Sequence, residues 1–156
     1  MSARHYLAYH TPVRMGYGGS AIDTAVLLTS KEAEASAAAR EGATVWLIGR
    51  EEGDAHVYWY GWIVAQEWKA PLLDERGFNG ELHGDPVVSR IRPMQDGEPV
   101  VLDGLAWLPA ALNVLGNGAF GLQALYDETV IAALEALRHT APRMGGGPPR
   151  SRKKRP

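Results

Sequence analysis

The sequence predicts an α+β fold, in which a mixed sheet or small barrel of about six strands carries two or three helices on its outside. Residues 43–68 contain two β-branched and aromatic runs joined by a polar segment, which is typical of a hairpin with a longer loop. Residues 29–42 and 127–139 are rich in helix formers. These segments are unevenly interspersed along 156 residues, a length that fits one domain.

Charge divides the chain into an acidic body and a basic end. Residues 1–140 are expected to form the domain, and residues 141–156 a flexible linker rich in glycine and proline with a basic tail. Residues 1–149 hold 11 of the 16 basic residues and all 18 acidic ones, a net charge of −7. An acidic body disfavours binding driven broadly by phosphate charge. The tail is either a tether for nucleic acid or a solubilising end, and the sequence leaves both open.

The composition also restricts the compartment. The chain has no cysteine, which excludes disulfides, thiolate zinc sites and cysteine nucleophiles. No run of about 18 apolar residues predicts a membrane span, and the first residues lack the basic and then apolar layout of a signal peptide. We therefore expect a cytoplasmic protein with no membrane partner.

The first part of the chain predicts one strand and a loop. Residues 5–10 predict a strand that ends at Pro12, because proline holds the preceding residue in an extended conformation. The three glycines of residues 13–20 predict a loop. Residues 21–29 show no clean period and leave either a short strand or a linker open.

Two helices have recognisable ends. Thr29 and Glu32 have the spacing of a capping box, which predicts the start of the first helix, and Gly42 predicts its end. Asp127 is expected to cap a final helix that continues to about residue 139. The buried stripe of this final helix is expected to comprise Val130, Ile131, Leu134 and Leu137.

The second run of the hairpin is expected to be a central strand. Side chains alternate between the faces of a strand, so Trp59 should share one face with Ile63, and Tyr60 the other with Trp62. Both faces are apolar or aromatic, which indicates cover on both sides. Gly61 interrupts the run and predicts a bulge or the close approach of another backbone or ligand.

The segment between the hairpin and the final helix has weaker patterns. Residues 69–86 predict a long irregular connection. Strands are expected at 87–93 and 100–102, a short helix within 105–115, and a last strand at 119–125.

The order of these elements resembles a known family. A strand ending in His10-Thr11-Pro12 and a helix precede Val45-Trp46-Leu47-Ile48, and then come Tyr60-Gly61-Trp62-Ile63-Val64-Ala65 and Pro99-Val100-Val101-Leu102. Over roughly residues 5–138 this succession resembles the EVE domain of the PUA-like superfamily. The stretch from Tyr9 to Gly16 is similar to EVE modules of bacterial modified-DNA restriction proteins. The chain departs from the pattern at Ala43, where the family usually has aspartate.

The resemblance implies a PUA-like curved mixed sheet or pseudo-barrel, with a cleft able to receive a flipped or modified base. It implies a non-catalytic module that reads such a base, above all a modified cytosine such as 5-methylcytosine in DNA. RNA is the other nucleic acid that it allows. A nuclease partner is implied as well, because the related modules belong to restriction systems.

A module that reads a flipped base needs flat side chains to hold the ring and polar groups for its edge. The aromatic candidates, at strand ends next to loops, are Tyr9, Tyr17, Trp46, Tyr58 and Trp59. The polar candidates for base or phosphate contacts are His10, Thr11, Arg14, Arg50 and Asn117. Each aromatic could instead belong to the core, since large aromatics carry much of the packing in small domains. Asn117, between two glycines, is also typical of a turn.

Two alternatives to base reading stay open. The acidic body favours a protein-interaction or structural domain. The related ASCH group includes small amidohydrolases, so Glu67, Asp54 or Glu51 with Lys69 could supply acid and base groups for hydrolysis of a nucleoside-like substrate. The histidines lack metal-ligand spacing, and no serine lies in a nucleophile motif, so we expect no metal, no cofactor and no catalytic residue.

Overall fold

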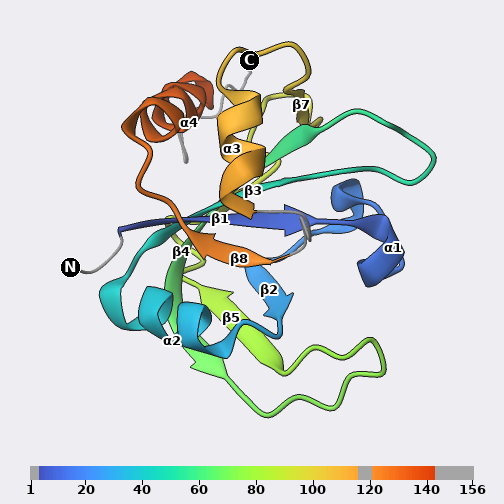
Figure 1. Ribbon diagram of the computed structural model, residues 1–156, viewed down its shortest axis with the longest axis vertical. Helices are drawn as coiled ribbons and strands as arrows, with labels where there is room; N and C mark the ends of the chain where they lie inside the picture. Colours follow the sequence, from blue (N-terminus) through green and yellow to red (C-terminus); the bar gives the residue numbers. More distant parts are fainter. Residues whose placement is uncertain (1–3, 116–120, 143–156) are drawn as a thin grey trace, which may run out of the picture.

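The computed structural model describes residues 4–115 and 121–142. This part of the chain forms an open, mixed sheet of 8 strands with four α-helices and one 3-10 turn around it (Figure 1). The strands are β1 (His5–His10), β2 (Val26–Thr29), β3 (Thr44–Gly49), β4 (Tyr58–Lys69), β5 (Gly80–Gly84), β6 (Arg90–Ile91), β7 (Val100–Val101) and β8 (Leu122–Ala124). The helical elements are α1 (Pro12–Met15), η1 (Gly19–Ala21), α2 (Glu32–Glu41), α3 (Leu108–Leu115) and α4 (Glu128–Thr140). The predicted α+β class is confirmed.

The sheet has the strand order β2-β5-β4-β3-β1-β8, and β6 and β7 add to β4. Only β1 and β3 run parallel among the described pairs. The prediction of an irregular connection over residues 69–86 was wrong, because β5 lies inside it and pairs with both β2 and β4. Of the strand predicted at 87–93, only Arg90–Ile91 (β6) forms a strand. The preceding residues form a turn, in which Ser89 N donates to Asp85 O at 2.9 Å.

Strand β4 is central, as predicted, and Gly61 forms a bulge. The register with β3 shifts between Leu47 and Ile48, opposite Gly61, which has φ 121° and would place a Cβ against the carbonyl oxygen of Arg90. The extra residue reverses the alternation beyond it. The prediction that side chains alternate without interruption along this strand, which paired Trp59 with Ile63 and Tyr60 with Trp62, was therefore wrong. Trp59 lies with Trp62, and Tyr60 lies with Ile63.

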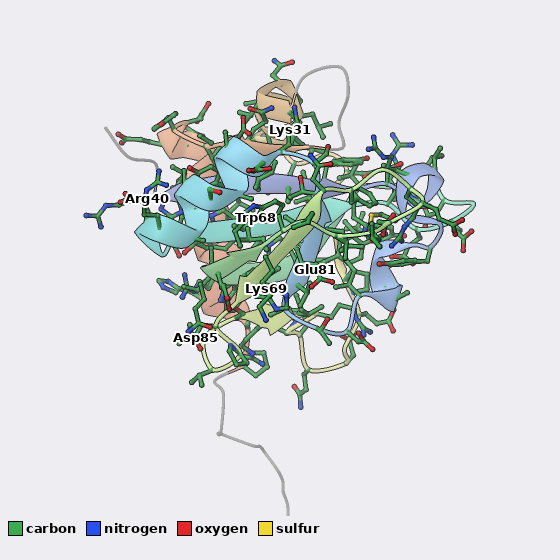
Figure 2. The ribbon with its side chains drawn as sticks, turned by 90° about the horizontal axis from the view of Figure 1, so that it is seen from below. Lys31, Arg40, Trp68, Lys69, Glu81 and Asp85 are labelled. Carbon is green, nitrogen blue, oxygen red and sulfur yellow. The ribbon has the colours of Figure 1, made fainter. Side chains whose placement is uncertain are left out.

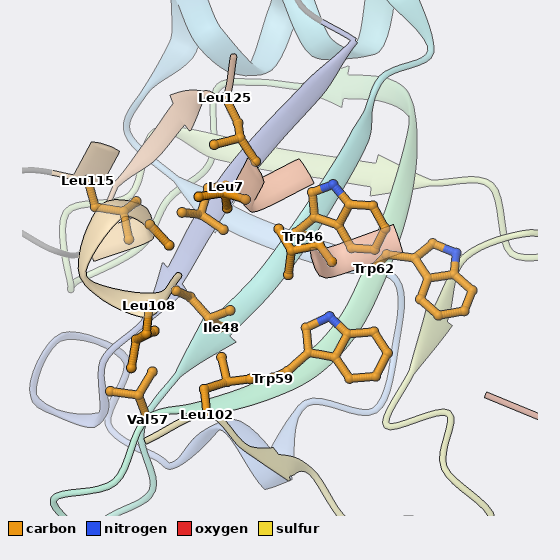
Figure 3. Close-up of a cluster of buried hydrophobic side chains, with 13 residues drawn as sticks. Leu7, Trp46, Ile48, Val57, Trp59, Trp62, Leu102, Leu108, Leu115 and Leu125 are labelled. Atoms are coloured by element: carbon orange, nitrogen blue, oxygen red, sulfur yellow. The ribbon is translucent and has the colours of Figure 1, made fainter. Parts of the chain in front are cut away.

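Each face of the sheet has its own core. Helix α2 covers one face through Ala35 and Ala38, and α3 and α4 cover the other (Figure 1). The second core contains three tryptophans, and Figure 3 shows them beside the leucines of α3 and the neighbouring strands. Its buried members are Leu7, Trp46, Ile48, Val57, Trp59, Trp62, Leu102, Leu108, Ala111, Leu115, Leu125, Val130 and Leu134.

The helix ends follow the sequence in part. Asp127 caps α4, since its Oδ1 accepts from the backbone N–H groups of Thr129 (3.0 Å) and Val130 (3.1 Å). Gly42 ends α2 in the left-handed conformation, φ 63°. The predicted capping box at Thr29 does not form, because the Thr29 hydroxyl accepts from Lys31 N (3.0 Å), one residue before the helix.

The stripe predicted on α4 divides in two, with Val130 and Leu134 buried and Ile131 and Leu137 partly buried. Asn117 and residues 143–156 lie outside the described residues. Among the residues that are described, no helix has the length and apolarity to cross a membrane.

Candidate functional site

An open groove of about 1010 Å³ lies between α1 and the loop that joins β3 to β4, and we call it the α1 groove. One wall comes from the end of β1 and from α1, and the other comes from the loop. Its lining residues are Tyr9, Thr11, Pro12, Val13, Arg14, Arg50, Glu51, Glu52, Gly53, Asp54 and Ala55. Four of the ten predicted site residues, Tyr9, Thr11, Arg14 and Arg50, therefore line one groove.

The parallel pairing of β1 with β3 explains why these residues meet. His10 at the end of β1 is the register partner of Gly49 at the end of β3, so the segments that follow both strands start at one edge of the sheet. Arg50 N donates to His10 O at 3.0 Å and joins the two segments. A Cβ at Gly49 would collide with the His10 backbone, so only glycine permits this approach.

Tyr9 and Arg50 are joined across the two walls. Arg50 Nε donates to the Tyr9 hydroxyl at 2.9 Å, which orients both a half-buried ring and an exposed guanidinium. Among the described residues this is the only hydrogen bond of the Arg50 side chain. Its two Nη groups can therefore donate to a ligand.

His10 and Tyr17 do not line the groove. His10 is 7% exposed, and its Nε2 lies 2.6 Å from the carbonyl oxygen of Tyr17. Because a carbonyl only accepts, Nε2 carries the proton, and burial lowers the pKa of His10. The prediction of His10 as a base contact is therefore corrected to a neutral, buried residue that fixes the Tyr17 backbone.

Glu51 holds the glycine-rich loop, residues 16–20, against the wall of the groove. Its Oε2 accepts from Ser20 N (2.7 Å) and from the Tyr60 hydroxyl (2.5 Å). Burial first, and then this bond, raises the pKa of Tyr60 far above its usual range. A Cβ at Gly19 would collide with the Tyr60 ring, so the loop can lie this close only with glycine there. Tyr60 was not among the predicted site residues, although the glycine pair at 18–19 was a signal of close approach.

Tyr58 contributes through the groove residue Asp54. The Tyr58 hydroxyl donates to Asp54 Oδ2 at 2.5 Å, which raises the pKa of Tyr58 to about 12 and lowers the pKa of Asp54. Beyond this pair, His56 Nδ1 lies 2.8 Å from Asp103 Oδ2, and that carboxylate raises the pKa of His56. No sequence signal pointed to Asp103, because 47 residues separate it from His56.

Arg14 links α1 to the connection between β4 and β5. Its guanidinium carbon lies 5.0 Å from the centre of the Phe78 ring, and that of Arg76 lies 5.4 Å from the same centre. Arg76 also donates to Met15 O (2.8 Å) and pairs with Asp74 (2.6 Å). The β4–β5 connection therefore also holds α1 in place.

Trp46 and Trp59 are core residues, which corrects their prediction as exposed members of an aromatic cage. Both are 0% exposed and belong to the core under α3 and α4 (Figure 3). They lie on the two central strands, where both faces are covered. Within the described part of the chain, Tyr9 is the one aromatic residue that lines the α1 groove.

The proposed acid and base groups do not converge. Glu51 and Asp54 line the groove, but Lys69 lies opposite Glu81 on the β4–β5 ladder (Figure 2) and has its ion-pair contact with Glu67 at 3.9 Å. The described residues contain no cluster of three or more His, Cys, Asp or Glu that could bind a metal ion.

Comparisons of the chain with family models, with curated proteins and with solved structures gave no match.

Proposed function

We propose that the chain is a non-catalytic nucleic-acid-binding module of the EVE type, which takes up one modified base in the α1 groove. Modified cytosine in DNA is the ligand that we favour, and RNA is the other nucleic acid to test. A nuclease partner and a cytoplasmic location belong to the same proposal. The absence of cysteine fits a reducing compartment.

The observation that carries the proposal is the chemistry of the groove lining. The half-buried ring of Tyr9 offers a flat face to a base, and Arg50 offers donors for a phosphate or a base acceptor. Among the described residues Glu51 Oε1 accepts no hydrogen bond, and a carboxylate oxygen is an acceptor of the kind that pairs with the amino group of cytosine. The groove thus supplies both halves of a hydrogen-bonded edge beside a ring.

The charge of the chain limits how nucleic acid could bind. The net charge of −7 over residues 1–149 opposes tight binding by phosphate contacts alone. Affinity would then depend on the groove. The basic residues of 150–156 would add an attraction that ignores sequence and modification.

The experiment is fluorescence anisotropy with labelled oligonucleotides that carry cytosine, 5-methylcytosine or 5-hydroxymethylcytosine, as duplexes and as single strands. Titrations at about 50 and about 150 mM salt separate charge-driven binding from groove binding. We expect tighter binding to one modified form, and roughly tenfold weaker binding by Arg50→Gln and Tyr9→Leu.

Matched controls use residues far from the groove. Arg40→Gln on α2 removes the same charge, and Tyr126→Leu removes a ring that is 60% exposed; both should bind as the unchanged protein does. Binding that ignores the modification and disappears on deletion of residues 150–156 would assign all contact with nucleic acid to the tail. No binding to any oligonucleotide would contradict the proposal.

A protein-interaction domain is the second candidate function. The burial of Trp46 and Trp59 leaves one aromatic residue in the groove lining among the described residues. The acidic body favours a basic protein surface as partner. Failure of the oligonucleotide titrations would favour this function.

A further inference from the structure

We propose that Val13 enters the base stack of a double helix as an apolar wedge when a base is taken up in the α1 groove. The ligand is therefore duplex DNA rather than a single strand. This inference rests on the proposed function and adds to it the form of the nucleic acid and the residue that opens it.

Val13 is an unusual aliphatic residue for its place. It is 96% exposed and lines the groove, whereas Met15, two residues further on the same helix, is buried. An isolated exposed aliphatic side chain on a surface needs no explanation. Val13 differs because it stands at the lip of a groove that is large enough for a nucleotide.

The fold prevents Val13 from turning inward. Within α1, Thr11 O accepts from Met15 N at 2.9 Å, and Pro12 O accepts from Gly16 N at 2.8 Å. Outside the helix, Arg76 Nη1 donates to Met15 O at 2.8 Å. These bonds anchor α1 on the side of Met15 and hold the Val13 side chain out toward a partner.

The groove lining favours one extruded base over a single strand. Proteins that bind single strands stack successive bases on several aromatic side chains along a groove. Among the described residues, the α1 groove has one such ring, that of Tyr9. One ring suits one base that has left a duplex, and the gap left behind must be filled. Apolar side chains that enter between base steps do this in other DNA-binding proteins.

The charges around the groove favour the approach of a duplex over α1, where Val13 lies. The loop wall carries three acids, Glu51, Glu52 and Asp54, against the single arginine Arg50, so that on balance it repels phosphates. Pro12–Met15 carries one arginine and no acid. A duplex would therefore approach over α1, where Val13 stands, with Arg14 beside it.

The test compares Val13→Ser with Leu73→Ser. Leu73 is also fully exposed, but it lies on the β4–β5 connection and does not line the groove. The probes are a duplex with a central 5-methylcytosine opposite guanine, the same duplex with an abasic site opposite, and the single strand. A 2-aminopurine next to the target base reports unstacking by its fluorescence.

We expect Val13→Ser to weaken binding to the fully paired duplex about tenfold and to abolish the rise in 2-aminopurine fluorescence. Binding to the single strand should stay within about twofold, and the abasic duplex should lose less than the paired one, because its base is easier to extrude. Val13→Leu keeps an apolar side chain and should restore most of the binding to the paired duplex that Val13→Ser loses. Leu73→Ser, which lies outside the groove, should change nothing.

Three results would overturn the wedge while leaving the proposed function intact. In the first, Val13→Ser leaves binding to the paired duplex unchanged. In the second, Val13→Ser weakens binding to the single strand as much as binding to the paired duplex. In the third, Leu73→Ser has the same effect as Val13→Ser. Failure of the unchanged protein to bind any of the three probes, together with no binding to any oligonucleotide in the anisotropy titrations, would overturn both proposals. Thermal unfolding of each variant checks that the fold is retained.

Discussion

Glu51 and Tyr60 form the contact that fixes the rear of the α1 groove. The Tyr60 hydroxyl donates to Glu51 Oε2 at 2.5 Å, and the same oxygen accepts from Ser20 N. Tyr60 is fully buried on the central strand β4, whereas Glu51 lines the groove. One carboxylate therefore connects the sheet, the glycine-rich loop and the candidate site.

Tyr60→Phe should lower the free energy of unfolding by about 1.5–3 kcal/mol, because it removes a hydrogen bond to a charged group and leaves the ring in place. Urea denaturation measures this difference. Tyr126→Phe is the control, since Tyr126 is exposed and should change stability by less than about 0.5 kcal/mol. Equal effects of the two substitutions would show that the Glu51 contact contributes nothing.

Gly61→Ala should be among the most destabilising single changes in the chain. Gly61 has φ 121°, and a Cβ would collide with Arg90 O on the neighbouring strand β6. Backbone strain and the collision together should cost about 3 kcal/mol or more.

Gly53→Ala separates the two causes. Gly53 also has a positive φ, 69°, but its Cβ would meet no atom within 4 Å. It should cost about 1 kcal/mol, from strain alone. A Gly61→Ala variant as stable as Gly53→Ala in urea would mean that β6 can move away from the bulge.

Local patterns were sufficient for the elements with strong periodicity. The strand at 5–10, the hairpin, the bulge at Gly61 and the cap at Asp127 each depend on neighbours in sequence, and all were predicted. Strand β5 was missed because Gly80–Gly84 has one fully buried leucine between polar residues and glycines. It becomes a strand by pairing with β2 and β4, which is a tertiary effect.

Four of the ten candidate residues line the α1 groove, but their arrangement was not predicted. Tyr9, Thr11, Arg14 and Arg50 meet because β1 and β3 are parallel, and such long-range pairing leaves no local mark. Trp46 and Trp59 were predicted to hold a base but are buried in the core, and the sequence already contained the reason for their burial. A strand that is apolar on both faces is central, and its aromatic side chains are then buried wherever they fall along it.

Trp59→Phe should destabilise the protein less than Trp46→Phe, by about 1 kcal/mol. Both indoles are fully buried, but Trp46 Nε1 donates to His5 Nδ1 at 3.0 Å, whereas Trp59 Nε1 has no partner among the described residues. Phenylalanine removes similar volume from both sites, so the hydrogen bond makes the difference. Urea midpoints in the reverse order would indicate that packing outweighs it.

The pH dependence of stability should carry the signature of His10. Burial lowers the pKa of His10 below its usual 6.5, so the unfolded chain takes up a proton more readily than the folded one. The stability that His10 contributes is complete above pH 6.5 and is lost as the pH falls through 6.5 toward the folded pKa. His10→Gln keeps a donor for Tyr17 O but does not titrate.

Unfolding free energies of the unchanged protein should therefore fall more steeply between pH 7 and pH 5 than those of His10→Gln. The exposed His56 has a raised pKa beside Asp103, so its contribution has the opposite sign and is lost as pH rises; His56→Gln should steepen the decline on acidification. Parallel curves for the unchanged protein and His10→Gln would show that His10 titrates alike in both states, and would remove the burial argument for its neutral form.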